Sequence, residues 1–300
     1  MKPLLLAMPG NERMADALAA ALTADRCPVT VRHFPDGESY VRIAGDVAGR
    51  ETVIVCTLDR PDEKLVALCL LAGAARENGS SRVGLVAPYL AYMRQDRRFN
   101  DGEATSARHV ARWLGAQFDW LVTVDPHLHR IRTLAELYGI PSHVVPAAGA
   151  IAEWIRSNVR QPLLVGPDEE SAQWVADVAG RVGAPHVVLT KTRRGDRDVS
   201  VSVPQVERWK GHTPVLVDDI VSTARTMVET VRGVRECGMA DPVCIAVHAI
   251  FAAGALGELQ DAGAAQVASA DTVVHPTNAI SLAGPLAIAI GEMVVAGSGR

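Results

Sequence analysis

Two adjacent carboxylates, Asp218 and Asp219, follow the apolar run 215–217 and precede the small, hydroxyl-bearing segment 222–226. Hydrophobic residues recur at helical spacing from Met227 onward, so we expect a strand, a turn and a helix here, with the two acids at the end of the strand. Carboxylates in that place can accept hydrogen bonds from the vicinal hydroxyls of a sugar or hold a cation. The free N–H groups and the positive dipole end of the following helix suit a bound phosphate.

The same stretch has a simpler interpretation, because many α/β proteins end a strand in acids and cap the next helix with Ser or Thr. It nevertheless resembles the phosphoribosyl diphosphate-binding loop, in which a hydrophobic strand precedes two acids and a Thr-Ala/Gly-x-Thr turn. That resemblance implies a phosphoribosyltransferase-type site. It leaves the reaction open between a transferase and a synthase.

The composition is that of an ordinary globular protein. A chain of 300 residues, 48% hydrophobic and 21% charged, is long enough for about two domains with a large buried core. The formal net charge of −4 gives no broad basic surface, so we expect no nucleic acid and no membrane as partner, and a small ligand.

The expected location is cytoplasmic. The apolar run 4–8 is too short for a signal peptide, and no apolar run approaches the roughly 20 residues of a membrane span. The five cysteines show no Cys-x-x-Cys spacing, so we expect them to be reduced core residues.

Polar residues also follow two other expected strands. The arginine-rich segment 92–99 comes after the strand 82–87, and Asp125 and His127 come after the strand 120–124. A charge run is usually a solvated loop, and a lone His at a strand end is more often structural than a ligand. Open α/β sheets nevertheless bind ligands at the carboxyl ends of their strands. The arginines therefore suit an anion, and Asp125 with His127 suits a cation or a phosphate.

The elements that must position these residues alternate between strand and helix. The chain begins with a strand at 4–8 and a helix for which Asn11 is the expected N-cap, followed by a hairpin of strands 29–34 and 39–43. This alternation predicts a mostly parallel sheet flanked by helices. Residues 191–198 are basic and contain Gly, and we expect them to form a mobile loop.

The two halves of the chain repeat one plan. Segments 52–88 and 214–250 both have the pattern of a strand, a turn, a long helix, a Gly-containing break and a second strand. In the first copy, residues 56–59 take the place of the two acids and the hydroxyl turn, so only the second copy keeps a phosphoribosyl loop. We therefore predict two pseudo-equivalent domains, at 1–143 and 144–300, with the C-terminal segment packing back on the first.

Taken together, these segments resemble the ribose-phosphate diphosphokinase family, the phosphoribosyl diphosphate synthases, over nearly the whole chain. Their order along the chain is the family's order, which makes a chance match a poor explanation. Arg98-Phe99 with Gly102-Glu103-Ala104 is similar to archaeal members in particular. The matching motifs are Phe34-Pro35-Asp36-Gly37-Glu38, Pro88-Tyr89 with Tyr92 and Arg94-Gln95-Asp96-Arg97, Asp125-Pro126-His127, Pro167-Asp168, Lys191 with Arg193, and Asp218-Asp219 to Thr226.

The resemblance implies both a fold and a reaction. Each half is expected to be an α/β domain of the type I phosphoribosyltransferase kind, the first with the nucleotide motifs and the second with the ribose-5-phosphate loop. Members of the family serve nucleotide biosynthesis by transferring the diphosphoryl group of ATP to the C1 hydroxyl of ribose 5-phosphate, with release of AMP. The implied cofactor is Mg²⁺. The implied assembly is a homo-oligomer, a dimer or a multiple of dimers, with composite nucleotide sites.

The resemblance also implies a role for each motif. Lys191 and Arg193 are the implied catalytic residues, whose charges would stabilise the transferring group. The implied nucleotide-binding residues are Phe34, Asp36, Gly37, Glu38, Arg94, Gln95 and Asp96. The implied ribose-5-phosphate ligands are Asp218, Asp219, Ser222, Thr223, Ala224, Arg225 and Thr226. The implied metal-site residues are Asp125, His127 and Asp168.

Some residues depart from the family pattern. Arg225 replaces a Gly in the phosphate loop, Ser222 replaces an acid found in many members, and Glu169 stands where a His is usual. The segment 139–141 also lacks the acid that commonly precedes Ile-Pro. Two alternatives therefore stay open. One is a catalytically weak or silent paralogue that binds a ligand or a partner, and the other is a base-linked phosphoribosyltransferase, which leaves the nucleotide motifs unused.

Arg225 allows two arrangements of the phosphate loop. Its side chain either points outward, so that the helix N-terminus alone binds the phosphate, or joins the site as a charged donor. We expect the outward arrangement, because Thr223 and Thr226 supply hydroxyls and Thr-Ala-Arg-Thr can begin a helix without a residue at positive φ.

Overall fold

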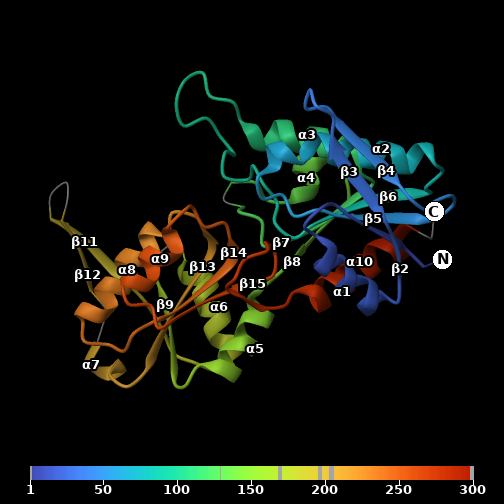
Figure 1. The fold of residues 1–300 in the computed structure, drawn as a ribbon. Helices are drawn as coiled ribbons and strands as arrows, with labels where there is room; N and C mark the ends of the chain where they lie inside the picture. The colour runs from blue at the N-terminus through green and yellow to red at the C-terminus, as the bar shows by residue number, and fades with distance from the viewer. Residues whose placement is uncertain (1, 129, 168–170, 195–197, 203–205, 298–300) are drawn as a thin grey trace. The chain divides into compact units, whose positions relative to one another are not determined.

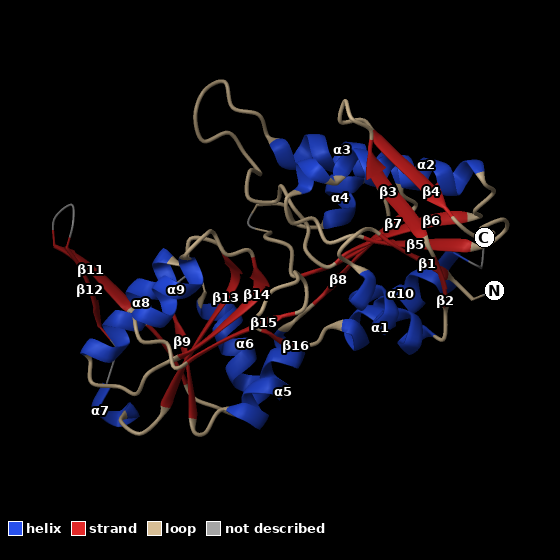
Figure 2. Cartoon of the chain, viewed as in Figure 1, coloured by secondary structure: helices blue, strands red, loops and turns tan. Residues whose placement is uncertain are grey.

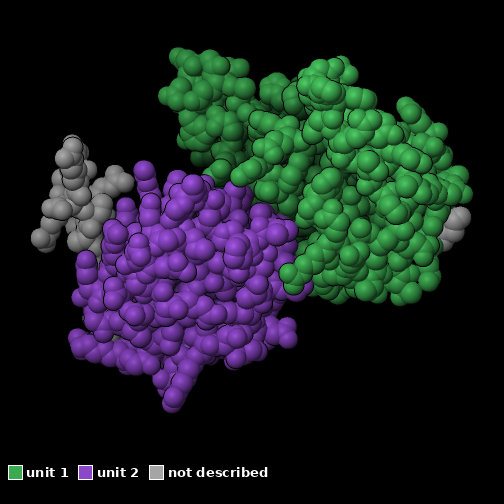
Figure 3. All heavy atoms as spheres, viewed as in Figure 1, with its two compact units in different colours: residues 1–145, 283–300 green, residues 146–282 purple. Residues whose placement is uncertain are grey.

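The computed structural model describes residues 2–128, 130–167, 171–194, 198–202 and 206–297 (Figure 1). The chain forms two compact units, which Figure 3 shows in different colours. Unit 1 consists of residues 1–145 and 283–300, and unit 2 consists of residues 146–282. Within the described ranges, none of the helices has the length and apolar character that crossing a membrane requires.

A parallel sheet forms the centre of unit 1. Its described strands are β1 (Leu4–Ala7), β2 (Asp25–Cys27), β5 (Glu51–Val55), β6 (Arg82–Ala87), β7 (Trp120–Val124) and β8 (Ser142–Val145). They lie side by side in the order β2-β1-β5-β6-β7-β8. The inner strands are almost wholly apolar and buried, as expected for a sheet that is covered on both faces.

Helices cover both faces of this sheet (Figure 2). They are α1 (Glu12–Leu22), α2 (Leu65–Glu77), α3 (Ser106–Gln117), α4 (Leu134–Tyr138) and α10 (Ala283–Gly297), with a 3₁₀ turn, η1 (Pro61–Glu63), before α2. Helices α2, α3 and α4 lie on one face, and α1 and α10 lie on the other. Polar side chains on the outer face of α1 and α3 and apolar ones on the inner face give these helices their amphipathic pattern.

The helix α10 joins unit 1 although it follows all of unit 2 in the chain. It is apolar almost all round, and it packs on α1, β7 and β8 (Figure 1). Its buried side chains include Leu286 and Ile290. The Arg82 guanidinium, which pairs with Glu51 at 3.1 Å, also donates to the carbonyl of Met293 at 3.3 Å. The C-terminal segment thus completes one face of the unit 1 sheet.

Unit 2 is built on a second parallel sheet. Its described strands are β9 (Pro162–Gly166), β10 (His186–Val188), β13 (Thr213–Val221), β14 (Val243–Ala249), β15 (Gln266–Ala270) and β16 (Asn278–Ile280). Its helices are α5 (Ala148–Asn158), α6 (Ala172–Val182), α7 (Val206–Trp209), α8 (Arg225–Glu236) and α9 (Ala255–Asp261). The strand order is β10-β9-β13-β14-β15-β16. A cluster of buried apolar side chains from β9, β13, β14, α8 and α9 fills the core on one side.

The two sheets match strand for strand. In each unit the first strand is second in the row, and the strands that follow the hairpin occupy the same successive places. The segment β5-α2-β6 of unit 1 therefore corresponds to β13-α8-β14 of unit 2, which confirms the predicted duplication.

Each unit also carries an antiparallel hairpin at the same point of its chain path. In unit 1 the hairpin is β3 (Val29–His33) with β4 (Ser39–Ile43), and β4 packs on α2. In unit 2 it is β11 (Thr190–Arg194) with β12 (Asp198–Ser202). Both hairpins leave the sheet after its edge strand, β2 or β10, and return before its central strand, β5 or β13. The two hairpins are therefore equivalent insertions, and each carries one of the charged motifs.

Candidate active site

The strand β13 is longer than the sequence suggested, and it contains both acids of the phosphoribosyl-type loop. It pairs with β14 through Asp218, Ile220 and Val221, so the prediction that the strand ends at the two acids is wrong. Ladder hydrogen bonds are made by the backbone, and polar side chains do not interrupt them. The carboxylates also bond to neighbouring amides, from Asp219 N to Asp218 Oδ1 at 3.0 Å and from Ile220 N to Asp219 Oδ1 at 2.7 Å. Both half-buried acids are thus held rigidly beside the turn that follows.

The turn into α8 contains a residue with a left-handed backbone. Ala224 has φ 56°, and Arg225 is the first residue of the helix. The expectation that the helix begins without positive φ is therefore wrong. The chain must reverse from β13 into α8 within a few residues, and one left-handed residue achieves this at a cost of about 1–2 kcal/mol for a residue other than Gly. The methyl group of Ala224 is buried in the unit 2 core, which helps to hold this conformation.

The amino end of α8 is open to a ligand. Thr223, Arg225 and Thr226 are exposed, and Ser222 is half-buried. The first backbone N–H groups of any helix have no partner within the helix and carry its positive dipole end. Threonine hydroxyls beside those N–H groups and carboxylates on the preceding strand form one continuous polar surface. This surface suits a phosphorylated sugar, with the phosphate at the helix and the sugar hydroxyls at Asp218 and Asp219.

The tip of the β3–β4 hairpin, residues 34–38, is a tight and exposed turn. The N–H of Phe34 donates to the carbonyl of Glu38 at 2.8 Å, and Gly37 takes φ 92°, a conformation that favours glycine. The Arg32 guanidinium lies over the Phe34 ring at 4.6 Å and over the Tyr40 ring at 4.2 Å. The tip thus presents an aromatic ring next to acidic side chains, which suits a base and a ribose more than a phosphate chain.

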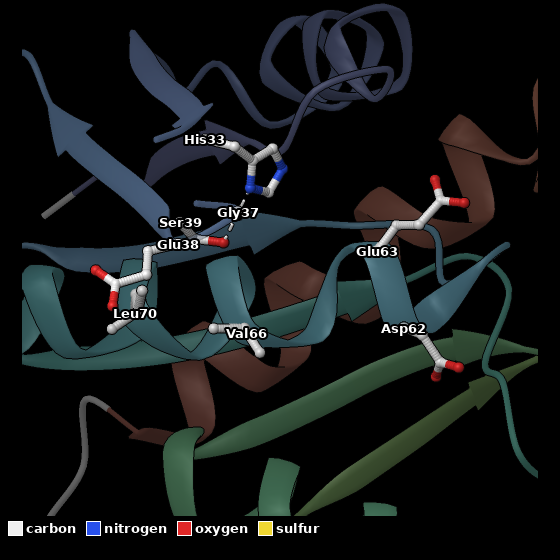
Figure 4. A pocket seen from close by; sticks show the side chains of 8 residues that line it. All are labelled: His33, Gly37, Glu38, Ser39, Asp62, Glu63, Val66 and Leu70. Carbon is white, nitrogen blue, oxygen red and sulfur yellow. Dashed lines mark hydrogen bonds between the residues drawn. The ribbon is translucent and has the colours of Figure 1, made fainter. Parts of the chain in front are cut away.

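An open pocket of about 570 Å³ lies between this hairpin and the start of α2 (Figure 4). Its acidic side chains are Glu38, Asp62 and Glu63, and Val66 and Leu70 supply an apolar wall. Three carboxylates make this pocket a poor place for a triphosphate. The acidic lining therefore disfavours a phosphate chain in this pocket.

The segment 88–105 after β6 carries the Arg-Gln-Asp motif. Its start is buried and its later part is exposed. The backbone of Tyr89 holds the start in place, because its carbonyl accepts from the N–H of Leu58 and its N–H donates to the hydroxyl oxygen of Thr57. The Glu103 carboxylate holds the turn in this later part together by accepting hydrogen bonds from it. Hydrogen bonds from the Asn100 side chain and from the N–H groups of Phe99 and Asn100 lower its pKa to about 2. Glu103, which belongs to the archaeal-type motif at 98–104, also accepts from Gln95 Nε2 at 3.1 Å and so supports the Arg-Gln-Asp segment.

Two strand-end segments of unit 1 meet at the carboxyl edge of the sheet. The strands β6 and β7 are parallel neighbours, and Arg130 from the second segment donates to both oxygens of Asp96 in the first, at 3.1 and 3.2 Å. Asp125 directly follows β7 with φ 29°, and His127 lies two residues later. No local pattern indicates Arg130, because the pairing joins residues that are 34 positions apart.

The implied catalytic residues lie on the unit 2 hairpin. The backbone of Lys191 and Arg193 belongs to β11, opposite Val201 and Val199 of β12, so the prediction of a loop is wrong for these positions. The hairpin forms because the alternating Val-Ser run of β12 supplies a partner strand. Asp168 and Glu169 lie outside the described residues. The described residues contain no group of three or more His, Cys, Asp or Glu side chains that could hold a metal ion.

Comparisons with known proteins agree with this picture. Residues 4–117 match the family model for the N-terminal domain of ribose phosphate pyrophosphokinase, and residues 135–281 match the phosphoribosyl transferase domain. The chain is 35% identical to the ribose-phosphate pyrophosphokinase of Methanopyrus kandleri over 97% of this chain and 99% of that protein. It is 35% identical to the enzyme of the same name from Thermococcus kodakarensis over 91% of this chain and 95% of that protein.

A solved structure has the same fold over the full length. The crystal structure of phosphoribosylpyrophosphate synthetase from Mycobacterium smegmatis covers 99% of this chain and 100% of its own, with a TM-score of 0.86 and 25% identity. The archaeal relatives agree with the archaeal character of the motif at 98–104. The chain therefore belongs to the ribose-phosphate pyrophosphokinase family, and it is an enzyme of that family, a ribose-phosphate diphosphokinase with two phosphoribosyltransferase-type domains.

Proposed function

We propose that the enzyme transfers the β,γ-diphosphoryl group of ATP to the C1 hydroxyl of ribose 5-phosphate, forming phosphoribosyl diphosphate and AMP. The observation that carries this proposal is the β13–α8 turn, where two half-buried carboxylates precede an open helix N-terminus with exposed threonines. Such a surface binds a sugar and a phosphate side by side. The Arg-Gln-Asp segment and the acidic hairpin tip supply nucleotide-binding groups that base-linked phosphoribosyl transfer does not require.

Each motif has a proposed role in this reaction. Diphosphoryl transfer demands positive charge on the transferring group and alignment of the two substrates. We assign the charge to Lys191 and Arg193. We assign the grip on ATP to Phe34, Asp36, Gly37, Glu38, Arg94, Gln95 and Asp96. We assign the grip on ribose 5-phosphate to Asp218, Asp219, Ser222, Thr223, Ala224, Arg225 and Thr226, with Arg225 acting through its backbone N–H at the start of α8.

We propose Mg²⁺ as the cofactor, held by Asp125, His127 and Asp168 together with the phosphates of ATP. Mg²⁺ commonly uses one or two carboxylates and completes its shell with phosphates and water, so a metal cluster made by the protein alone is not required. The residues fit in that sense, because half-buried Asp125 directly follows β7 and a second potential ligand, His127, lies two residues later. The metal would neutralise charge on the diphosphoryl group.

We also propose a homo-oligomer, a dimer or a multiple of dimers, with composite nucleotide sites. The support is the exposed hairpin tip: Phe34 is 40% exposed, and Asp36 and Glu38 are exposed as well. Groups that bind a nucleotide need to be covered on a second side to exclude water, and a neighbouring subunit can provide that cover. Light scattering that finds a fully active monomer at assay concentration would end this part of the proposal.

An AMP-release assay tests the reaction directly. Purified enzyme with ATP, Mg²⁺ and ribose 5-phosphate, and no added base, is expected to release one AMP for each phosphoribosyl diphosphate formed. Omission of ribose 5-phosphate or chelation of Mg²⁺ is expected to abolish the release. Activity that requires a nucleobase would show a phosphoribosyltransferase, and ligand binding without turnover would show a silent paralogue.

A further inference from the structure

The loop between β14 and α9, residues 250–254, supports the main chain that leads into the phosphate loop. The N–H of Ile250 donates to the carbonyl of Val221 at 3.1 Å, and the N–H of Ala252 donates to the carbonyl of Ser222 at 3.0 Å. Both acceptors lie directly before Thr223. Any displacement of these two N–H groups therefore moves the start of the phosphate loop.

The aromatic side chain of Phe251 stands between the two donors in sequence. Its ring stacks on the imidazole of His275, with the ring centroids 4.8 Å apart and the planes inclined by 28°. Phe251 also packs against the buried apolar cluster of unit 2, which includes Ala224 and Met227 from the phosphate loop and α8. The Phe251 side chain thus contacts both the His275 ring and the buried core beneath the β13–α8 turn.

The imidazole of His275 is itself fixed to the end of the sheet. The backbone N–H of His275 donates to Asn278 Oδ1 at 2.9 Å, and the ring Nδ1 accepts the N–H of Thr277 at 3.3 Å. The Asn278 amide in turn donates to the carbonyl of Ala270, the last residue of β15, at 2.9 Å. The ring Nδ1 also lies 2.8 Å from Thr277 Oγ1, a contact in which a neutral imidazole can accept or donate. Burial lowers the pKa of His275, which favours this neutral form.

We propose that Phe251, stacked on His275, is a positioning residue for ribose 5-phosphate. This inference rests on the proposed function of the β13–α8 turn as the sugar-phosphate site. The stack fixes the β14–α9 loop, and the loop fixes the carbonyls of Val221 and Ser222. The left-handed Ala224 and the N-terminus of α8 then face the phosphate in one geometry. Ala224 lacks the freedom of glycine at its φ, so the turn depends on such outside support.

Steady-state kinetics of paired variants test this role. Phe251→Leu and His275→Ala are each expected to raise KM for ribose 5-phosphate about fivefold or more, with KM for ATP changed less than about twofold. Phe251→Tyr and His275→Phe keep an aromatic stack and are expected to restore KM to near the wild-type value. The double variant Phe251→Leu/His275→Ala is expected to be no worse than the worse single one, because both changes remove the same contact.

Val274→Ala is the matched control, since Val274 neighbours His275 in the chain but is 74% exposed. It is expected to leave both KM values unchanged. Equal rises in both KM values, or a lower melting temperature with KM for ribose 5-phosphate unchanged, would overturn the positioning role. Failure of the tyrosine and phenylalanine variants to restore KM would also overturn it.

Hydrogen exchange separates this inference from the proposed function. In Phe251→Leu without ligand, the amides of residues 222–228 are expected to exchange about tenfold faster than in the wild type, with exchange in β1 and β5 unchanged. If the wild type released no AMP but this local change appeared, the proposed function would fail while the structural support of the loop would stand. Unchanged exchange in an active enzyme would overturn the support instead.

Discussion

The equivalent turns of the two units differ in what they leave open. In unit 2, the turn from β13 to α8 exposes a helix N-terminus, threonines and two half-buried acids. In unit 1, the turn from β5 to α2 is closed by its own side chains: Lys64 Nζ donates to Asp59 Oδ1 at 2.5 Å and to the carbonyl of Thr57 at 2.9 Å. The N–H of Thr57 donates to Asn11 Oδ1 at 2.7 Å.

The start of α2 is also unsuited to an anion. The helix is preceded by a 3₁₀ turn that begins with Pro61, which has no N–H, and continues with two acids, Asp62 and Glu63. One fold therefore provides the same strand, turn and helix twice, and the side chains decide whether the turn is a binding site or a structural support. The duplicated fold alone does not assign function to either turn.

The hairpins offer the largest test of this comparison. Lys191→Ala or Arg193→Ala, on the unit 2 hairpin, is expected to lower kcat about 100-fold or more, because these cations are proposed to stabilise the transferring group. The Kd for ribose 5-phosphate is expected to stay unchanged in calorimetry. Lys210→Ala, an exposed cation of unit 2 outside the hairpin, is the control. Lost binding with unchanged kcat would contradict the catalytic role.

The closed turn of unit 1 is expected to respond in stability. Asn11→Ala leaves the buried N–H of Thr57 without its acceptor, which costs about 1–3 kcal/mol of unfolding free energy. Denaturant titration of Asn11→Ala measures this loss of unfolding free energy, and Asn11→Ser is titrated in the same way for comparison. Serine retains N-cap ability but is too short to reach Thr57, so it is expected to be nearly as destabilising as alanine. A fully stable serine variant would show that capping, not the long-range bond, matters.

A matched pair of acids tests the open turn against the closed one. Asp219→Asn, in unit 2, is expected to raise KM for ribose 5-phosphate tenfold or more, about 1.4 kcal/mol. The reason is that an NH₂ donor replaces one of the two carboxylate oxygens that accept hydrogen bonds from the sugar hydroxyls. Asp59→Asn, at the corresponding turn of unit 1, is expected to leave that KM unchanged. Similar effects of both substitutions would refute the division of labour between the turns.

The smallest expected effect belongs to Arg225, one of the residues that depart from the family pattern. Its side chain is exposed at the first position of α8. Arg225→Gly is therefore expected to change KM for ribose 5-phosphate less than about threefold. A rise of tenfold or more in the same kinetic assay would show that the guanidinium binds the phosphate directly.

The sequence was sufficient to predict what depends on local patterns. The alternation of strands and helices predicts the two parallel sheets. The shared pattern of segments 52–88 and 214–250 predicts that the two sheets correspond to each other. The acids and hydroxyls of the β13–α8 turn were found because their chemistry stands in consecutive residues. The roles of the individual residues remain predictions.

Contacts between distant residues were beyond reach of such patterns. Asn11 was expected to cap α1, but its side chain makes no cap bond and instead accepts the N–H of Thr57. Cap preference is local, whereas this bond depends on β1 and β5 being neighbours. The same reason explains Arg130 on Asp96. Helix propensity does not predict the left-handed backbone of Ala224. That backbone is set by the change of chain direction between β13 and α8, which depends on where these two elements lie.

The place of α10 has a consequence for synthesis of the chain on the ribosome. Residues 146–282 form unit 2 without help from later residues, whereas residues 1–145 lack the helix that covers α1, β7 and β8 until 283–297 have been translated. The unit translated first is thus the one finished last. During the interval the part of the sheet face that α10 covers, at β7 and β8, stays uncovered, and exposed apolar surface of this kind promotes aggregation.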